Sequence, residues 1–465
     1  MAIPKIELEM TLAEMYQDVR KEHIFVPTML SSRFDLTPGI SKCTKYIYQH
    51  EAMNLPAHTG LEGVGGLAYV IKFLSVIPQQ FAFAAGTLPV VMFDFEISHE
   101  LERGSSEKGR NFAEETMSVL VPHQRPKLCF YKSPAEVHLN PKEQVLTASW
   151  PIDGLEHLPH TIKPEVHYAL HSKEGLARSG LQTPAFEVIT PALPSNGNSD
   201  TWLTTETHRI ISLISAKPLP FALKLQQTML GFGTYIIRTP SEHQKLITNI
   251  LPNLLSSNYL PYRNTSNTHL GPANLIITAV IGDIAADLSL TLFVNQAGTC
   301  KFICGTTQRL ANGVFFSGAT IDYRDQDTFE RRCESTMQQI GAFLHSQKYY
   351  GPVNADVLED SHGRQWIVDL NVRMPGSYVL GALKKHFWAQ RGLGIASLLF
   401  KSLKGVARKD FVESLSKEFE EGRVVIVAWY EDESEGRSFA TLVVGAEDEE
   451  ALVRIVQKVS GFCEE

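Results

Sequence analysis

The sequence predicts a mixed α/β and α+β protein of about three folding units. Its 465 residues are too many for one domain, since domains are typically ~150 residues long. The N-terminal region combines apolar helix-like runs with strand-like runs, the middle region is rich in short β-type runs, and the C-terminal region reads strand, strand, helix. We therefore expect three units, at residues 1–165, 166–405 and 406–465.

The first unit, residues 1–165, is expected to be an α/β domain. Its longest apolar stretch, from Leu67 to Phe95, contains a lysine, two glutamines and two prolines, so it cannot cross a bilayer as one helix. Helix, turn and strand is the expected order. The strand is LPVVMFDFEI, whose β-branched and aromatic residues are typical of a buried strand.

The second unit, residues 166–405, is expected to be α+β. A helix should end near Gly180, and Pro184 should lead into a strand. From that point strands are expected to dominate, including the runs LIITAVI, LSLTLFV and KFICGT. The run TFERRCESTMQQIGAFLHSQ then has helical spacing.

The third unit, residues 406–465, is expected to be small. The runs RVVIVAWYED and RSFATLVVGA are strand-like, SEG joins them, and EDEEALVRIVQKVSGF has helical spacing. A ββα arrangement follows.

Composition favours a small-molecule partner. Hydrophobic residues make up 43% and charged residues 20% of the chain, as in globular proteins. The net charge of −8 disfavours nonspecific binding to nucleic acid or to anionic membranes. The N-terminus has no basic segment followed by an apolar core, so a cytoplasmic location is expected. The six cysteines are scattered and predict no metal site.

A set of polar residues near one hairpin predicts a magnesium site. In GPVNADVLEDSHGRQWIVDLNVRMPGS, two strands flank the turn EDSHGR. Asp356 lies on the first strand, and Asp369 and Asn371 are two apart on the second, so the latter two point to one face. Carboxylate and amide oxygens suit Mg²⁺, which completes its shell with water and phosphates. Arg373 falls on the same face and could neutralise a phosphoryl group.

A second element upstream suits a nucleoside triphosphate. In PFALKLQQTMLGFGTYII, a strand carries Lys224 and a short loop with Gly231, Phe232 and Gly233 follows. A lysine on a rigid strand supplies a point charge for phosphate oxygens, and glycines let backbone N–H groups approach them. The alternatives are a lysine whose stem lies on the protein while its ammonium reaches water, and an ordinary hairpin turn.

Together, the lysine strand, the glycine loop, a β-rich hinge, Asp356 and the DLNVR run resemble the ATP-grasp superfamily in content and order. The resemblance covers Tyr168 to about Lys404, and the chain as a whole, including RFDLTPGI and GLEGVGG, is similar to fungal ATP-grasp proteins. It implies an ATP-grasp fold preceded by a pre-ATP-grasp domain. One departure is that the family usually has Glu where this chain has Asp369.

The resemblance also implies roles for individual residues. Lys224 would bind the α and β phosphates, with Lys173 as a second basic contact. Asp356, Asp369 and Asn371 would hold Mg²⁺, or Mn²⁺ in its place, with Arg373 beside the γ-phosphoryl group. Catalytic roles would fall to Arg373 and Lys224. The remaining nucleotide contacts would be the loop Leu230, Gly231, Phe232, Gly233 and Thr234, the hinge Thr278, Ala279, Val280 and Ile281, and Asp283 at the ribose.

The activity that the resemblance implies is an ATP- and Mg²⁺-dependent ligase. It would activate a carboxylate as an acyl phosphate and join it to an amine, forming ADP and phosphate. Two alternatives stay open. The same nucleotide site would serve an acyl-CoA ligase or a carboxylase, and a chain that had lost turnover would be an ATP-binding regulatory protein. The expected partners are the carboxylate and amine substrates, and a homo-oligomer is compatible with the sequence.

A glycine cluster in the first unit is a further candidate for an anion site. Gly60, Gly63, Gly65 and Gly66 precede an apolar helical run, whose first N–H groups could face an anion. The spacing is not G-x-G-x-x-G, and a tight structural turn is the favoured interpretation.

Overall fold

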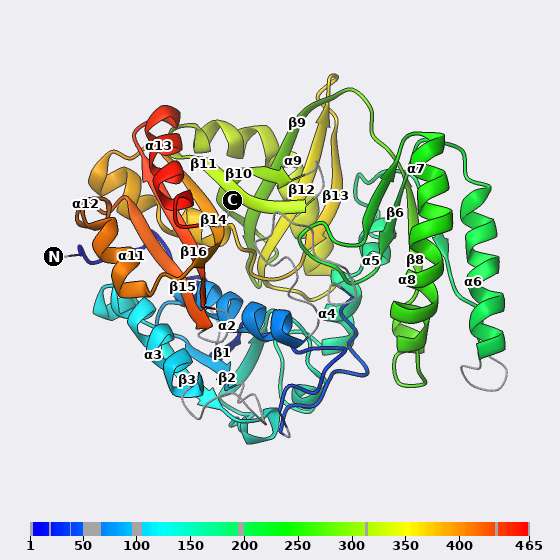
Figure 1. The fold of residues 1–465 in the computed structure, drawn as a ribbon, viewed down its shortest axis with the longest axis horizontal. Coiled ribbons are helices and arrows are strands. Elements are labelled where there is room, and N and C mark those ends of the chain that lie inside the picture. Colours follow the sequence, from blue (N-terminus) through cyan, green and yellow to red (C-terminus); the bar gives the residue numbers. More distant parts are fainter. Residues whose placement is uncertain are drawn as a thin grey trace.

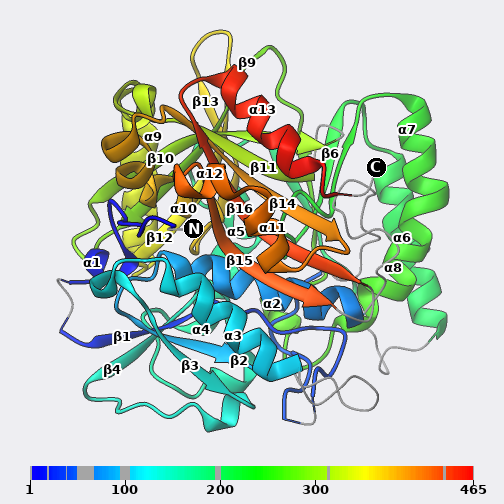
Figure 2. The same cartoon turned by 60° about the vertical axis from the view of Figure 1, so that its left-hand side comes forward.

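The computed structural model describes most of the chain. The described residues are 3–17, 20–37, 39–49, 67–94, 105–193, 200–311, 315–432 and 436–463. The glycine cluster at Gly60, Gly63, Gly65 and Gly66 lies outside these ranges. The described strands form three sheets, and Figures 1 and 2 show the helices packed around them.

The N-terminal region forms a four-stranded parallel sheet with the order β3-β2-β1-β4. The expected helix, turn and strand between Leu67 and Phe93 are confirmed as α2 and β2, with a left-handed Gly86 between them. Residues of β2 are mostly buried, which explains the continuous apolar run. The elements are α1 (Leu12–Met15), β1 (Glu22–Val26), α2 (Leu67–Phe83), β2 (Pro89–Phe93), α3 (Ser105–Ser118), β3 (Lys127–Tyr131) and β4 (Gln144–Ala148).

The next region forms a four-stranded antiparallel sheet with the order β5-β8-β6-β7. Helices α6, α7 and α8 pack beside it, at the right of Figure 1. The elements are α4 (Pro164–His171), α5 (Lys173–Ala177), β5 (Phe186–Ile189), α6 (Asp200–Ser215), β6 (Phe221–Leu225), β7 (Thr234–Ile237), α7 (Pro240–Lys245), α8 (Leu251–Asn258) and β8 (Leu275–Ala279).

The expectation that strands dominate after Pro184 is wrong for residues 200–215 and 240–258, which are helical. Helix α6 is rich in Thr and Ile, which favour strands in isolation. Its buried residues include Glu206, Ile210 and Ile214, which recur every four positions, and this side of the helix packs on α8 in a core that also contains residues of the sheet. Packing of this face therefore outweighs local β propensity.

The third sheet has eight strands in the order β13-β12-β9-β10-β11-β14-β16-β15. The expected ββα segment is confirmed as β15, β16 and α13, and β16 pairs with β14, so the segment extends this sheet. The strands are β9 (Ile284–Val294), β10 (Cys300–Ala311), β11 (Phe315–Asp322), β12 (Gly351–Asp360), β13 (Gln365–Asn371), β14 (Ile395–Lys404), β15 (Val424–Asp432) and β16 (Arg437–Ala446). The helices are α9 (Gln326–Ser346), α10 (Tyr378–Ala382), α11 (Arg408–Ser414), α12 (Ser416–Glu420) and α13 (Glu449–Ser460).

Helix α2 joins the N-terminal region to the C-terminal strands. It packs against β15 and β16, and Figure 2 shows it running beneath β15. Gln79 donates a hydrogen bond from Nε2 to the carbonyl of Trp429 at 3.0 Å, and Trp429 N donates to Gln79 Oε1 at 3.1 Å. These two hydrogen bonds hold α2 against strand β15. Among the described residues, no helix is long and apolar enough to cross a membrane.

One glycine on β16 leads to a test of core packing. A Cβ added at Gly445 would lie 2.4 Å from the ring of Phe387, which is fully buried. We expect Gly445→Ala to lower the free energy of unfolding by about 1 to 3 kcal/mol, because the ring cannot move without disturbing the core. Urea unfolding measures the change.

The matched control is Gly109→Ala in α3, where an added Cβ meets nothing within 4 Å. It should be neutral or stabilise by about 0.5 to 1 kcal/mol, since alanine favours a helix. Equal effects of the two substitutions would contradict the packing argument.

Candidate functional site

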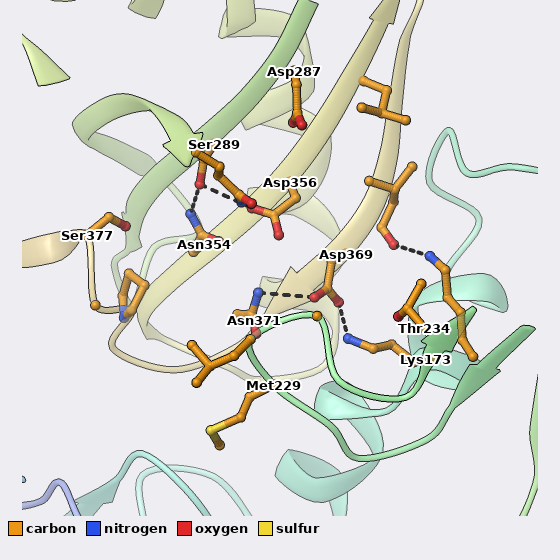
Figure 3. Close-up of a pocket in the computed structure, with 18 of the residues that line it drawn as sticks. Lys173, Met229, Thr234, Asp287, Ser289, Asn354, Asp356, Asp369, Asn371 and Ser377 are labelled. Carbon is orange, nitrogen blue, oxygen red and sulfur yellow. Dashed lines mark hydrogen bonds and ion pairs between the residues drawn. The ribbon is translucent and has the colours of Figure 1, made fainter. Parts of the chain in front are cut away.

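A cavity of about 460 Å³ lies where the three regions meet. Strands β6, β7 and β8 form one wall, strands β9, β12 and β13 form another, and α2 with Trp150 closes a third side. Figure 3 shows part of its lining. The residues expected from the sequence that line it are Lys173, Lys224, Leu230, Gly231, Thr234, Thr278, Ala279, Val280, Ile281, Asp356, Asp369, Asn371 and Arg373.

Three of the expected residues do not line the cavity. Phe232 is 2% exposed and belongs to the protein interior. Gly233 is left-handed, and a Cβ there would lie within 3.0 Å of Leu225 and Thr228, so its role in the structure is to close the β6–β7 hairpin. Asp283 is exposed on the segment that links β8 to β9. The roles expected for these residues at the nucleotide stay predictions.

The acidic residues of the cavity come from three neighbouring strands. Asp356 on β12 lies directly opposite Asp369 on β13, and Asn354 lies opposite Asn371. On β9, Ser289 lies opposite Asp356. Side chains two apart on a strand share a face, so these polar groups gather on one surface of the sheet, as Figure 3 shows.

Asp356 is held by hydrogen bonds within the cavity wall. It accepts from Ser289 Oγ at 3.1 Å and from Gln308 Nε2 at 2.5 Å. Limited hydration and the nearby carboxylates of Asp369 and Asp287 raise the pKa of Asp356 to about 7. A nearby cation would reverse this shift, because it would favour the ionised form.

Asp369 has the opposite electrostatic environment. Lys173 Nζ lies 2.5 Å from Asp369 Oδ1. Burial alone would raise the pKa of Asp369, but Lys173, Lys224 and Arg373 together hold it below the usual value. The pKa values of the two adjacent carboxylates therefore shift in opposite directions, because the basic residues cluster around Asp369.

Lys173 is positioned by the start of α5. The hydroxyl of Ser172 caps this helix by accepting from Gly175 N at 2.8 Å. Lys173 N donates to the carbonyl of Gln226, which follows β6, at 3.2 Å. Lys173 is therefore tied to the β6–β7 hairpin through its backbone and to β13 through its side chain.

Lys224 is the second lysine of the cavity. It lies on β6, and its Nζ donates to the carbonyl of Val368 at 2.7 Å. Burial lowers the pKa of Lys224 to about 8, with Lys173 adding to the effect and Asp369 opposing it. An anionic ligand beside this amine would favour its charged form.

Arg373 lies over the ring of Trp150. Its guanidinium carbon lies 4.9 Å from the centre of the Trp150 ring. It donates to Asn371 Oδ1 at 3.1 Å and to the carbonyl of Met374 at 3.2 Å. Burial lowers the pKa of Arg373 to about 10, so it is still a cation at neutral pH. These two bonds use two of the five N–H donors of a guanidinium.

Several cavity residues were missed by sequence reasoning. Asp287 is a third carboxylate on the wall, and its pKa is raised by burial. Asp287 and Ser289 are two apart on a strand, which is a detectable signal, but their place beside Asp356 depends on strand register. Gln308, Trp150 and Gln80 gave no local signal, because each reaches the cavity only through packing of distant elements.

Oxygen atoms dominate the candidate metal-binding part of the cavity. The carboxylates of Asp356 and Asp369 and the amide oxygen of Asn371 are hard donors of the kind that Mg²⁺ prefers. Within the described residues, no group of three or more His, Cys, Asp or Glu side chains could hold a metal alone. This donor set fits an ion that takes most of its ligands from water and a phosphate substrate, as Mg²⁺ commonly does.

Comparisons with known proteins give similarities at the level of structure alone. No protein-family model matches the chain, and no curated protein matches it. N5-carboxyaminoimidazole synthetase from Staphylococcus aureus complexed with ADP is 12% identical, with 95% of this chain and 97% of that chain covered and a TM-score of 0.45. The L-amino acid ligase from Bacillus licheniformis is 10% identical, with 95% and 98% covered and a TM-score of 0.46.

A third similar structure is the biotin carboxylase domain of 2-oxoglutarate carboxylase from Hydrogenobacter thermophilus, in complex with MgADP, ADP and bicarbonate. It is 10% identical, with 95% of this chain and 90% of that chain covered and a TM-score of 0.45. These similarities assign neither a family nor an activity to this chain.

The raised pKa of Asp356 predicts a pH dependence of stability. The native pKa of about 7 lies above the ordinary value of ~3.9. The resulting stabilisation is complete below pH ~3.9 and is lost as pH rises through the native pKa. We expect wild-type protein to lose stability relative to Asp356→Asn as pH rises from about 4 to about 7, by on the order of 1.4 kcal/mol for each unit of difference between the native and unfolded pKa.

Urea unfolding of both proteins across this range, in a metal chelator, measures the difference. A difference that does not change with pH would contradict the assignment. Added Mg²⁺ should reduce the loss in wild-type protein if the ion binds beside Asp356.

Proposed function

We propose that this protein is an ATP- and Mg²⁺-dependent ligase of the ATP-grasp type. It activates a carboxylate as an acyl phosphate and joins it to an amine, forming ADP and phosphate. The main support is one observation: Lys173, Lys224 and Arg373 converge on the carboxylate pair at Asp356 and Asp369 within a single cavity. Phosphoryl transfer needs mainly positioning and charge neutralisation, which this set supplies.

The other end of the cavity supports binding of a nucleoside. Thr278 to Ile281 leave β8 toward β9, and together with Ala222 and Ile236 they make an apolar slot with backbone groups at its edge. Such a slot suits a flat heterocycle recognised by backbone hydrogen bonds. Leu230 and Gly231, both left-handed, form the turn that lines the adjoining part.

The two lysines would bind the phosphates of ATP. They come from different elements, α5 and β6, and Figure 3 shows Lys173 pointing toward Asp369. Their ammonium groups now contact Asp369 and the carbonyl of Val368. Phosphate oxygens would replace these partners.

Asp356, Asp369 and Asn371 would hold Mg²⁺, and Mn²⁺ would satisfy the same donors. When bound, the ion neutralises phosphate charge. Binding of the ion would change the contacts of Asp369 most, because one of its carboxylate oxygens is now paired with the ammonium group of Lys173. Asp356 would lose its raised pKa and stay ionised.

The reaction divides into two steps. In the first, a substrate carboxylate oxygen attacks the γ-phosphorus, the bond to the bridging oxygen breaks, and ADP leaves as the acyl phosphate forms. Arg373 lies where it would neutralise the transferring phosphoryl group. In the second, an amine attacks the acyl carbon, phosphate leaves, and the nitrogen loses a proton. No protein nucleophile takes part.

Steady-state ADP release tests the proposal. Wild-type protein with ATP, Mg²⁺ and a pool of carboxylates and amines should release ADP and phosphate. We expect Asp369→Asn to abolish release while leaving the fold intact, because a charged metal ligand is lost. The matched control is Asp322→Asn, an acid-to-amide change on the same sheet outside the cavity.

The outcomes separate the alternatives. Release of AMP, or release that Asp369→Asn leaves unchanged, would contradict the mechanism. Release only with a thiol acceptor or with bicarbonate would assign an acyl-CoA ligase or a carboxylase. ATP binding with no release under any condition would indicate a regulatory protein.

Nucleotide affinity tests the role of Lys224 separately. We expect Lys224→Met to weaken ATP binding by about 1.5 to 3 kcal/mol, the usual contribution of a hydrogen bond to a charged group. The aliphatic stem is retained, so the thermal stability of the free protein should change little. Calorimetric titration with ATP measures the effect, and Lys301→Met, an exposed change on β10, is the control. Equal affinities of wild type and Lys224→Met would exclude a phosphate contact.

A further inference from the structure

The part of the cavity beside α2 is apolar and aromatic. Phe73, Ile77 and Phe81 are spaced by four residues, so they lie on one face of α2. Trp150 and Phe400 complete this surface, and Trp150 stacks on Phe81 with ring centres 5.7 Å apart. Phe81 and Trp150 are each 3% exposed. We call these five residues the aromatic subsite.

Arg373 marks the boundary between the aromatic subsite and the acidic strands. Its guanidinium lies over the Trp150 ring, and the chain continues through Pro375 and Gly376, which also line the cavity. Among the described residues that line this end, Arg373 is the one with a charged side chain. A ligand bound at this end could pair its carboxylate with the guanidinium of Arg373, and the rest of the ligand would contact the apolar side chains of the aromatic subsite.

Gln80 supplies one unsatisfied acceptor at the same end. It lines the cavity, is 1% exposed, and donates from Nε2 to the carbonyl of Gly376 at 3.1 Å. A carbonyl only accepts, so this bond fixes the amide orientation. Oε1 is then buried without a hydrogen-bond partner in the described structure. An unsatisfied buried acceptor is costly, and a ligand N–H would remove that cost.

We propose that the aromatic subsite binds an α-amino acid with an apolar or aromatic side chain. Its carboxylate contacts Arg373, its amino group donates to Gln80 Oε1, and its side chain packs on the aromatic subsite. The inference rests on the proposed function for the reaction that this amino acid enters, but the binding itself is independent of turnover.

Direct binding to the full chain tests the proposal with a matched series of ligands. Phenylalanine has all three groups, 3-phenylpropanoate lacks the amine, and glutamate replaces the apolar side chain with a charged one. We expect phenylalanine to bind about tenfold or more tightly than either of the others. Calorimetric titration is done with ADP and Mg²⁺ present and again without them.

Two variants assign the contacts. Gln80→Met keeps the length of the side chain and removes the hydrogen-bond acceptor. The affinity for phenylalanine should therefore fall about tenfold, while the affinity for 3-phenylpropanoate should not change. Ile77→Trp fills the subsite, so both ligands should lose binding. Unchanged unfolding midpoints of the variants show that neither effect reflects loss of fold.

Each outcome decides the inference. Glutamate binding as tightly as phenylalanine, or equal loss of both ligands in Gln80→Met, would overturn it. Preferential binding of phenylalanine without any ADP release would support the amino acid subsite and reject the ligase. ADP release that depends on charged or polar substrates and not on apolar ones would support the ligase and reject the apolar amino acid subsite.

Discussion

The site depends on one electrostatic constraint: two carboxylates stand directly opposite each other on neighbouring strands, in a wall where hydration is limited. Asp356 and Asp369 would repel if both were ionised without compensation. This repulsion is reduced because cationic side chains lie beside Asp369, whereas Asp356 accepts hydrogen bonds from neutral donors. The charges of the carboxylate pair are thus compensated within the protein, and the proposed cation and phosphate would take over that compensation.

The cations reach Asp369 only because three regions pack together. Lys173 begins α5, Lys224 lies on the small antiparallel sheet, and Arg373 follows β13. The N-terminal region contributes Trp150, which supports Arg373, and α2, which Gln79 and Trp429 fasten to the C-terminal strands. A change outside the cavity lining, such as loss of the Gln79 contact, would therefore move the aromatic side of the site relative to its acidic side.

The two halves of the cavity suggest how substrate choice and chemistry are separated. The acidic and basic residues sit on strands and a helix start whose backbone bonds fix them. The aromatic subsite is built mainly from side chains of α2, which can change without altering the strands. Variation at Phe73 or Ile77 would then alter the ligand and leave the phosphate-binding groups in place.

Local pattern in the sequence determined much of the fold and part of the site. Strand alternation placed Asp369 and Asn371 on one face, and the apolar runs located α2, β2, α9 and the C-terminal ββα segment, because these signals depend on neighbouring residues alone. The tertiary structure decided the rest. Residues 200–215 and 240–258 are helical because their apolar faces pack into the core of the small antiparallel sheet, and Phe232 is interior because it is buried beside the β6–β7 hairpin. Asp287, Gln308, Gln80 and Trp150 joined the cavity through strand register and contacts between distant segments, which no local pattern specifies.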